Sequence, residues 1–132
     1  MNTNLEMSIL DKEVLHRFYD EICDGEVEIL VDIASDCVTE TQSLAKQIHT
    51  AFTVKDWELF NRSAHSMKST SRALGGIELS NRAEKMEHDS ASYKKPDFDP
   101  SGLTDPVSEL NHHVRAFVEE LRNEVAKNGG SI

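Results

Sequence analysis

The sequence is poor in proline and cysteine and has no long apolar run, and each shortage excludes a kind of protein. Only three of its 132 residues are prolines, and none precedes residue 96, so the first 95 residues are free to form long helices. The two cysteines, Cys23 and Cys37, have neither CxxC nor metal-ligand spacing, so we expect two buried thiols in a reducing compartment. No apolar run approaches the ~18 residues that a membrane-spanning helix needs.

Positive charge is scarce as well. The chain has 14 lysines and arginines against 24 aspartates and glutamates, which gives a net charge of −10 at pH 7. A nucleic-acid-binding protein needs a basic face, which this balance disfavours. The first ten residues lack the basic and apolar regions of a secretory signal. We therefore expect a cytoplasmic, monomeric, single-domain protein that binds neither nucleic acid nor a membrane.

Apolar residues recur every three or four positions in four long segments, which is the periodicity of amphipathic helices. These segments are residues 26–52, 54–74, 77–90 and 106–126. A shorter amphipathic segment, residues 10–22, precedes them, and we place its apolar stripe along Leu10, Val14, Phe18 and Ile22. No segment alternates as a β-strand does. The sequence predicts an all-α fold, namely an antiparallel four-helix bundle with an additional short N-terminal helix packed across one end.

Capping residues predict where these helices begin and end. The expected N-caps are Asp24, Thr53 with Asp56, and Asp105 with Pro106. Glycine-containing pairs at 75–76 and 128–129 predict helix ends, and the Pro- and Asp-rich stretch 94–106 predicts a loop. We therefore expect a tail over residues 1–8, one domain over residues 9–127, and a disordered tail over residues 128–132.

One histidine in the second long segment is predicted to point into solvent. At 100° per residue, His65 lies roughly 130° from the centre of its helix's apolar stripe. Three of its five surface neighbours are basic, namely Arg62, Lys68 and Arg72. Residues 53–74 carry a net charge of +2, whereas the rest of the chain carries −12. Such a patch could hold an anion such as a phosphoryl group, although an exposed histidine beside a lysine is also common.

The residues around His65 resemble a known signature. Residues 64–79 read Ala-His-Ser-Met-Lys-Ser-Thr-Ser-Arg-Ala-Leu-Gly-Gly-Ile-Glu-Leu, which is similar to the signature of histidine-containing phosphotransfer (Hpt) domains. The matching positions are His65, Lys68, Ser71, Gly75, Leu79 and Glu87, with Asp56 and Trp57 at the start of the same helix. The family's usual glycine after the lysine is Ser69 here, which is still small. A Lys-Ser pair also occurs in LuxU-type quorum-sensing phosphotransferases, which this chain resembles in length and in its Met-Asn-Thr start.

The resemblance implies an intermediate in a multistep two-component phosphorelay. His65 would accept a phosphoryl group through Nε2 from a receiver-domain aspartate of a hybrid sensor kinase and pass it to a response-regulator aspartate. Glu87 would hold Nδ1 and orient the ring, and Lys68 would stabilise the phosphoryl oxygens. We expect no cofactor and no metal on this chain, with Mg²⁺ supplied by the receiver partner. The sequence lacks the glycine-rich loops that bind ATP, so we expect a carrier without kinase activity.

We expect a partner to bind over the exposed surface around His65. The candidate residues are Asn61, Arg62, Ser69 and Arg72, together with Leu15 and Tyr19 at the edge of the N-terminal helix's apolar stripe. The main alternative function is that of a non-catalytic helical adaptor that has the same fold and does not use His65.

Two Glu-x-x-His pairs suggest a different kind of site. Glu13 with His16 and Glu109 with His112 have the spacing found in di-iron helix bundles. Di-iron ligands must face the bundle interior, whereas Glu109 and His112 lie roughly 120° and 180° from the apolar stripe of their helix. The sequence therefore disfavours a di-iron site.

Overall fold

The helical periodicity of the sequence corresponds to five α-helices in the computed structural model, which describes residues 8–132. The helices are α1 (Lys12–Glu21), α2 (Val27–Val54), α3 (Trp57–Ala73), α4 (Ile77–Ser90) and α5 (Thr104–Lys127), and a short 3₁₀ helix, η2 (Pro100–Leu103), precedes α5. Residues 8–132 contain no β-strand. The predicted all-α fold is confirmed.

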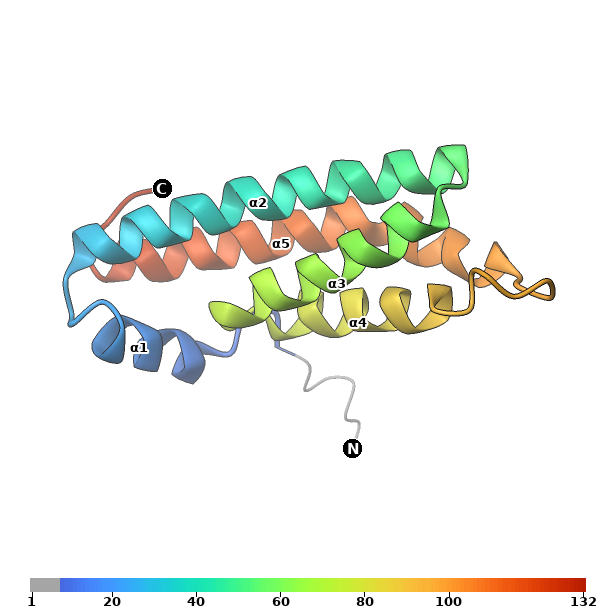
Figure 1. Ribbon diagram of the computed structural model, residues 1–132. Helices are drawn as coiled ribbons and strands as arrows, with labels where there is room; N and C mark the ends of the chain where they lie inside the picture. The colour runs from blue at the N-terminus through green and yellow to red at the C-terminus, as the bar shows by residue number, and fades with distance from the viewer. Residues whose placement is uncertain (1–7) are drawn as a thin grey trace, which may run out of the picture.

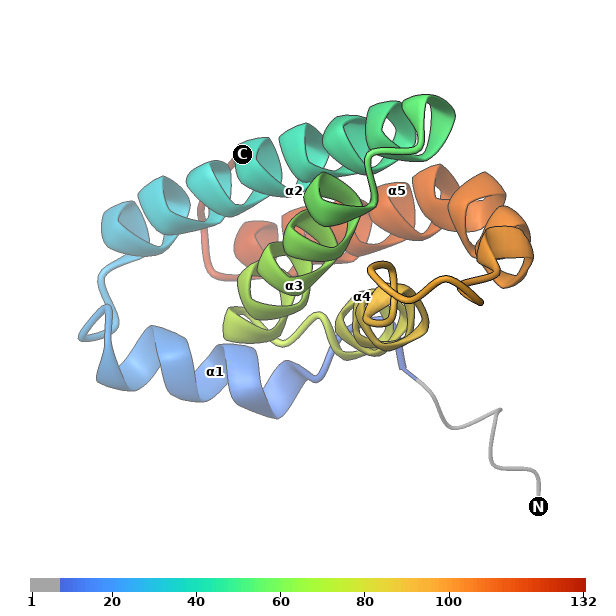
Figure 2. The same ribbon diagram turned by 45° about the vertical axis from the view of Figure 1, so that its right-hand side comes forward.

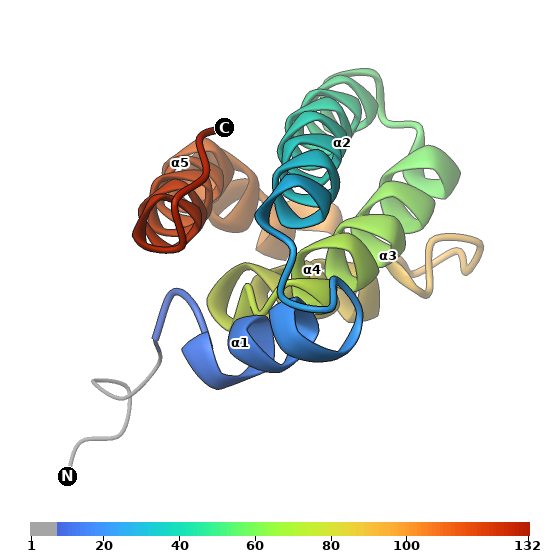
Figure 3. The same ribbon diagram turned by 90° about the vertical axis from the view of Figure 1, so that its left-hand side faces the viewer.

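Helices α2 to α5 form an antiparallel four-helix bundle (Figure 1). α2 packs against α3 and α5, and α4 packs against the same two helices, so the four surround one core, as the view along the bundle shows (Figure 3). Each helix turns one apolar stripe inward, because residues three and four apart share a helix face. Among the largest fully buried side chains are Leu30, Ile48, Phe60, Met67, Leu79, Met86, Leu110, Phe117 and Leu121. The predicted bundle is confirmed.

α2 and α5 are much longer than α3 and α4, and α1 fills the space that this difference leaves. α2 and α5 have 28 and 24 residues, whereas α3 and α4 have 17 and 14. α1 lies beyond the turn between α3 and α4, alongside the ends of the two long helices (Figures 1 and 2). Its start is fastened there by the Asp11 N–H, which donates to the Gly75 carbonyl at 2.6 Å. The N-terminal helix therefore extends the α3–α4 side of the bundle.

The apolar stripe of α1 differs from the predicted one. Leu15, expected at the edge of the stripe, is only 1% exposed and belongs to the core, whereas Ile22 is 61% exposed. The difference arises because Asp11 is the N-cap of α1, so Leu10 precedes the helix and does not contribute to its stripe. Without Leu10, the centre of the stripe moves toward Leu15. Leu15 is therefore unavailable to a partner, which corrects its assignment to the partner-binding surface.

The N-caps predicted for α2 and α3 are wrong in part. Asp24 adopts φ 52° in the turn before α2, and Glu26 is the N-cap of that helix. Thr53 belongs to the last turn of α2, where its hydroxyl donates to the His49 carbonyl, so Asp56 alone caps α3. Several consecutive residues could cap each helix, and the sequence does not show which of them packing selects.

α5 begins earlier than expected. Its first residue is Thr104 and its N-cap is Leu103, so Asp105 is not the cap. Pro106 lies in the first turn, where its missing N–H removes no helical hydrogen bond. The stretch 94–106, predicted to be one loop, therefore contains η2 and the start of α5.

Both glycine-containing helix ends are confirmed. After α3, Gly75 adopts φ 87° and the Gly76 N–H donates to the Ser71 carbonyl at 2.8 Å. After α5, Gly129 adopts φ 92° in the equivalent position. A left-handed residue after the helix, followed by an N–H that reaches back to the last turn, is the Schellman arrangement. Each of these helix ends is determined by residues next to one another in the sequence, so the glycines alone predict it.

Two further expectations concern the cysteines and the chain ends. Cys23 and Cys37 are both buried and free, as predicted. The domain limits, with tails over residues 1–8 and 128–132, stay a prediction. Residues 1–7 lie outside the part of the chain that the structure describes, and Ile132 packs, partly buried, against the core.

Candidate functional site

His65 lies in the middle of α3 and points away from the core. Its side chain is 57% exposed, whereas Ala64 beside it and Met67 two positions later are fully buried. This arrangement follows from the helical spacing, since Ala64 and Met67 belong to the stripe that faces the bundle interior. The predicted exposure of His65 is confirmed.

A single carboxylate from α4 joins His65 to Lys68. Glu87 Oε2 lies 2.7 Å from His65 Nδ1, and Glu87 Oε1 lies 2.8 Å from Lys68 Nζ. The pKa of Glu87 is lowered, mainly by the hydrogen bond from the Lys68 ammonium and also by His65, against the opposing effect of partial burial. Glu87 is therefore an ionised acceptor at neutral pH.

The ionised carboxylate determines which nitrogen of His65 can react. A carboxylate only accepts hydrogen bonds, so a neutral His65 ring must carry its hydrogen on Nδ1 to bond Glu87. Nε2 then keeps its lone pair, on a ring that is more than half exposed. The arrangement provides a nucleophilic nitrogen whose ring orientation is fixed from the opposite side.

The turn between α3 and α4 brings His65 and Glu87 to the same level. His65 precedes Gly75 by ten residues and Glu87 follows it by twelve. In two antiparallel helices with a rise of about 1.5 Å per residue, these separations correspond to about 15 and 18 Å from the turn. The glycine turn therefore sets the register that places an α4 carboxylate beside an α3 imidazole.

Asn61 makes a contact that the sequence did not suggest. It lies one turn before His65 and is half-buried. Its Nδ2 donates to the Glu87 carbonyl at 2.8 Å and to Ser90 Oγ at 2.9 Å. The amide is thus turned toward α4, which differs from its assignment to the surface that a partner would contact. This contact depends on the register of α4 against α3, which the sequence alone does not give.

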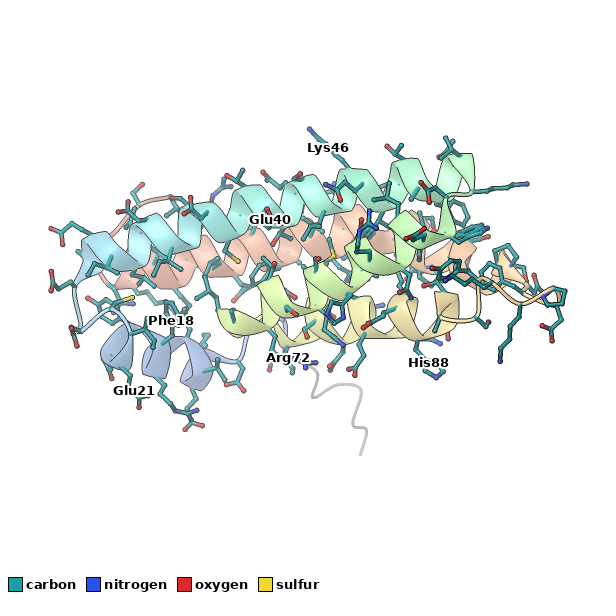
Figure 4. All side chains as sticks on the ribbon, viewed as in Figure 1. Phe18, Glu21, Glu40, Lys46, Arg72 and His88 are labelled. Carbon is teal, nitrogen blue, oxygen red and sulfur yellow. The ribbon has the colours of Figure 1, made fainter. Side chains whose placement is uncertain are left out.

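The basic neighbours of His65 are paired with carboxylates. Lys68 pairs with Glu87, and the exposed Arg72 lies 3.5 Å from Glu84, also on α4. Arg62 lies 3.8 Å from Glu58 on its own helix. The positive patch inferred from α3 alone is therefore largely compensated. Figure 4 shows Arg72 and His88 on the side of the molecule formed by α3 and α4, away from Lys46 on α2.

The other candidates for a partner surface have different exposures. Ser69 is exposed, one turn after His65, and its hydroxyl lies 3.5 Å from the His65 carbonyl. Arg62 and Arg72 are exposed as well. Tyr19 is half-buried and packs against the core. Ser69 and the two arginines therefore remain available at the surface, whereas Tyr19 is only partly accessible.

The Glu-x-x-His pairs do not form a metal site. Glu13, His16, Glu109 and His112 are all exposed. Within residues 8–132 no group of three or more His, Cys, Asp or Glu side chains could hold a metal ion. Over the same residues, no helix is long and apolar enough to cross a membrane.

Comparison with known proteins agrees with the geometry of the site. The sequence model of the Hpt domain matches residues 32–126, which is well over half of the chain and includes His65, Lys68 and Glu87. Searches of curated proteins and of solved structures found no significant match. The chain therefore belongs to the Hpt domain family, the histidine phosphotransfer domains of phosphorelays.

Proposed function

We propose that this protein carries phosphoryl groups on His65, which it accepts from one receiver-domain aspartate and transfers to another. The observation that carries this proposal is the 2.7 Å contact between Glu87 Oε2 and His65 Nδ1. This contact supports the proposal because it favours the tautomer of an exposed imidazole in which Nε2 can attack phosphorus.

The transfer moves a phosphoryl group without a change in oxidation state. The Nε2 lone pair attacks the phosphorus of the aspartyl phosphate in line, and the bond from phosphorus to the aspartate oxygen breaks. The aspartate leaves as a carboxylate with the electron pair of that bond. Positive charge develops on the imidazole as the N–P bond forms, and the Glu87 carboxylate stabilises it through Nδ1–H. Transfer to the second receiver reverses these steps.

Lys68 would stabilise the phosphoryl oxygens while it remains close to Glu87. Its ammonium group, one turn after His65, is paired with Glu87 Oε1 at 2.8 Å. An incoming phosphoryl group adds negative charge beside this ammonium, which favours sharing Lys68 between Glu87 and the phosphate. Lys68 thereby lowers the repulsion between the phosphoryl group and the Glu87 carboxylate.

The partners we propose are the receiver domain of a hybrid sensor kinase and the receiver domain of a response regulator. The Mg²⁺ that assists the reaction is bound by the receiver, and this chain contributes His65, Lys68 and Glu87. Ser69, Arg62 and Arg72 are the exposed side chains of α3 that a receiver would contact. The protein acts as a carrier, with no nucleotide chemistry of its own.

The alternative, a helical adaptor, does not account for the three-residue cluster. An adaptor needs no exposed histidine with a carboxylate 2.7 Å from Nδ1 and a lysine 2.8 Å from the same carboxylate. It would bind receivers without becoming phosphorylated.

The proposal is tested by incubating the protein with a phosphorylated receiver domain and Mg²⁺. Intact mass spectrometry should show the gain of one phosphoryl group, which acid removes because phosphohistidine is acid-labile. His65→Gln should not be labelled, whereas the control His88→Gln, at an exposed histidine of α4, should be labelled like the wild type. An acid-stable label, or no label with a receiver that binds the protein, would contradict the proposal and the latter would favour the adaptor.

A further inference from the structure

We propose that Asn61 is a positioning residue that keeps Glu87 within reach of His65 by fixing the last turn of α4. The consequence for phosphotransfer rests on the proposed function, but the structural effect on His65 does not. The proposal depends on two hydrogen bonds from one amide nitrogen, which join α3 to α4 beside the reactive histidine.

The first hydrogen bond fixes the main chain of Glu87. Asn61 Nδ2 donates to the Glu87 carbonyl at 2.8 Å. This carbonyl is one of the last four of α4, which have no N–H partner within the helix. At the C-cap, the Ala91 N–H reaches only the His88 carbonyl, at 3.2 Å. The Ser90 hydroxyl of the same turn also donates to the Glu87 carbonyl, at 3.2 Å, so the bond from Asn61 is the shorter one and the one that ties this carbonyl to α3.

The second hydrogen bond attaches the same amide to a buried hydroxyl. Asn61 Nδ2 also donates to Ser90 Oγ at 2.9 Å, and Ser90 is fully buried. Ser90 Oγ in turn donates to the Met86 carbonyl at 2.8 Å. A primary amide has two hydrogens to donate, and here each has an acceptor. The last turn of α4 is thus held by Asn61 at residue 90 as well as at residue 87.

The two attachments of Glu87 have different roles. Asn61 holds its main chain, whereas His65 and Lys68 bond its carboxylate. Helix ends tend to fray, and a displacement of about 1 Å is enough to impair a catalytic contact. Without Asn61, we expect the Glu87 carboxylate to leave His65 Nδ1 for part of the time, so that both ring tautomers of His65 are populated.

The test uses the ¹⁵N chemical shifts of the His65 ring, which distinguish the Nδ1–H and Nε2–H tautomers in the unphosphorylated protein. The wild type should show predominantly Nδ1–H. Asn61→Ala should shift the population toward the Nε2–H tautomer. Glu87→Gln should shift the population in the same direction. Phosphotransfer from a receiver should slow by about 10-fold, a typical loss when a supporting hydrogen bond is removed.

A matched control separates positioning from a general loss of stability. Asn111 also makes a hydrogen bond between helices, accepting from His49 Nε2 at 3.2 Å between α5 and α2. Asn111→Ala should leave the His65 ring shifts unchanged. Ser90→Ala, which removes one acceptor of Asn61, should shift the His65 tautomers in the same direction as Asn61→Ala, and it serves as the second variant if Asn61→Ala folds poorly.

The proposal is overturned if Asn61→Ala is folded and its His65 ring shifts equal those of the wild type, or if Asn111→Ala changes these shifts equally. Absence of His65 phosphorylation in the wild type would contradict the proposed function but would leave the tautomer result unaffected. The two failures are therefore distinguishable.

Discussion

Glu87 is the residue on which the proposed phosphotransfer chemistry depends. Each of its carboxylate oxygens has one partner, His65 Nδ1 at 2.7 Å and Lys68 Nζ at 2.8 Å. The partners are one turn apart on α3, so a single carboxylate can reach both. The reactivity of His65 and the charge of Lys68 are therefore coupled through the Glu87 side chain.

Replacing Lys68 tests this coupling. Lys68→Ala should slow phosphotransfer by about 10-fold without abolishing it, because the lysine stabilises charge and forms no bond to phosphorus. It should also raise the pKa of Glu87 toward its ordinary value of 4.5, since the Lys68 ammonium is the main cause of the lowering. Single-turnover transfer kinetics and NMR titration of the Glu87 carboxyl measure the two effects. If Lys68→Ala transferred the phosphoryl group at the wild-type rate, Lys68 would have no role in the transfer.

Ser69 tests how closely a receiver must approach. It is exposed one turn after His65, so Ser69→Gln should hinder approach to the imidazole and slow transfer while the fold stays intact. Ser69→Gly, the control, should transfer normally and lower the free energy of unfolding by at most about 0.5 kcal/mol through helix propensity. Kinetics and denaturant unfolding of both variants measure this. Equal transfer by Ser69→Gln and the wild type would show that the receiver does not approach over this face of α3.

At the scale of the elements, the α3–α4 hairpin builds the site, and its turn depends on Gly75. The helices, their apolar stripes and the glycine ends follow from local sequence, so the bundle and the exposure of His65 could be predicted. The contact between Asn61 and the last turn of α4 could not, because it joins residues 26 apart in sequence and depends on the register of the two helices. Glu84 as the partner of Arg72 was missed for the same reason.

Gly75→Ala should destabilise the protein by about 2 kcal/mol or more. Gly75 adopts φ 87°, which L-residues rarely adopt, and an added Cβ would lie 2.5 Å from the Asp11 main-chain oxygen. The control is Gly102→Ala, where a Cβ would meet no atom within 4 Å. Chemical denaturation gives both free energies of unfolding. A loss below about 0.5 kcal/mol for Gly75→Ala would show that the turn tolerates a side chain.

At the scale of the whole molecule, a buried carboxylate fastens α1 to the bundle. Glu124 of α5 is 3% exposed and lies 2.9 Å from Lys127 Nζ, 3.5 Å from Lys12 Nζ and 3.6 Å from His16 Nε2. Lys12 and His16 belong to α1, more than 100 residues away in sequence. No local pattern predicts such a cluster, so the sequence alone could not give the contacts that fasten α1 to α5.

Glu124→Gln should lower the free energy of unfolding by about 1.5–3 kcal/mol at pH 7, the usual range for a hydrogen bond to a charged group. The pKa of Glu124 is lowered in the folded protein, chiefly by the hydrogen bond from Lys127. Its stabilisation is therefore present above the unfolded pKa, near 4.5, and is lost as the pH falls through the lower folded pKa.

Unfolding curves between pH 7 and pH 3 measure this dependence. The difference between the wild type and Glu124→Gln should shrink over the acidic part of this range. The control Glu13→Gln, at an exposed residue of α1, should differ little from the wild type at any pH. A difference between Glu124→Gln and the wild type that is constant with pH would exclude an electrostatic role for Glu124.

The proposed transfer requires that Glu87 holds Nδ1 of His65 and leaves Nε2 to receive the phosphoryl group. The most direct test is NMR of histidine-¹⁵N-labelled protein phosphorylated by a receiver, in which ¹⁵N–³¹P coupling identifies the bonded nitrogen. We expect phosphorus on Nε2 of His65, with the hydrogen retained on Nδ1. Phosphorus on Nδ1 of His65, or on any other residue, would contradict it.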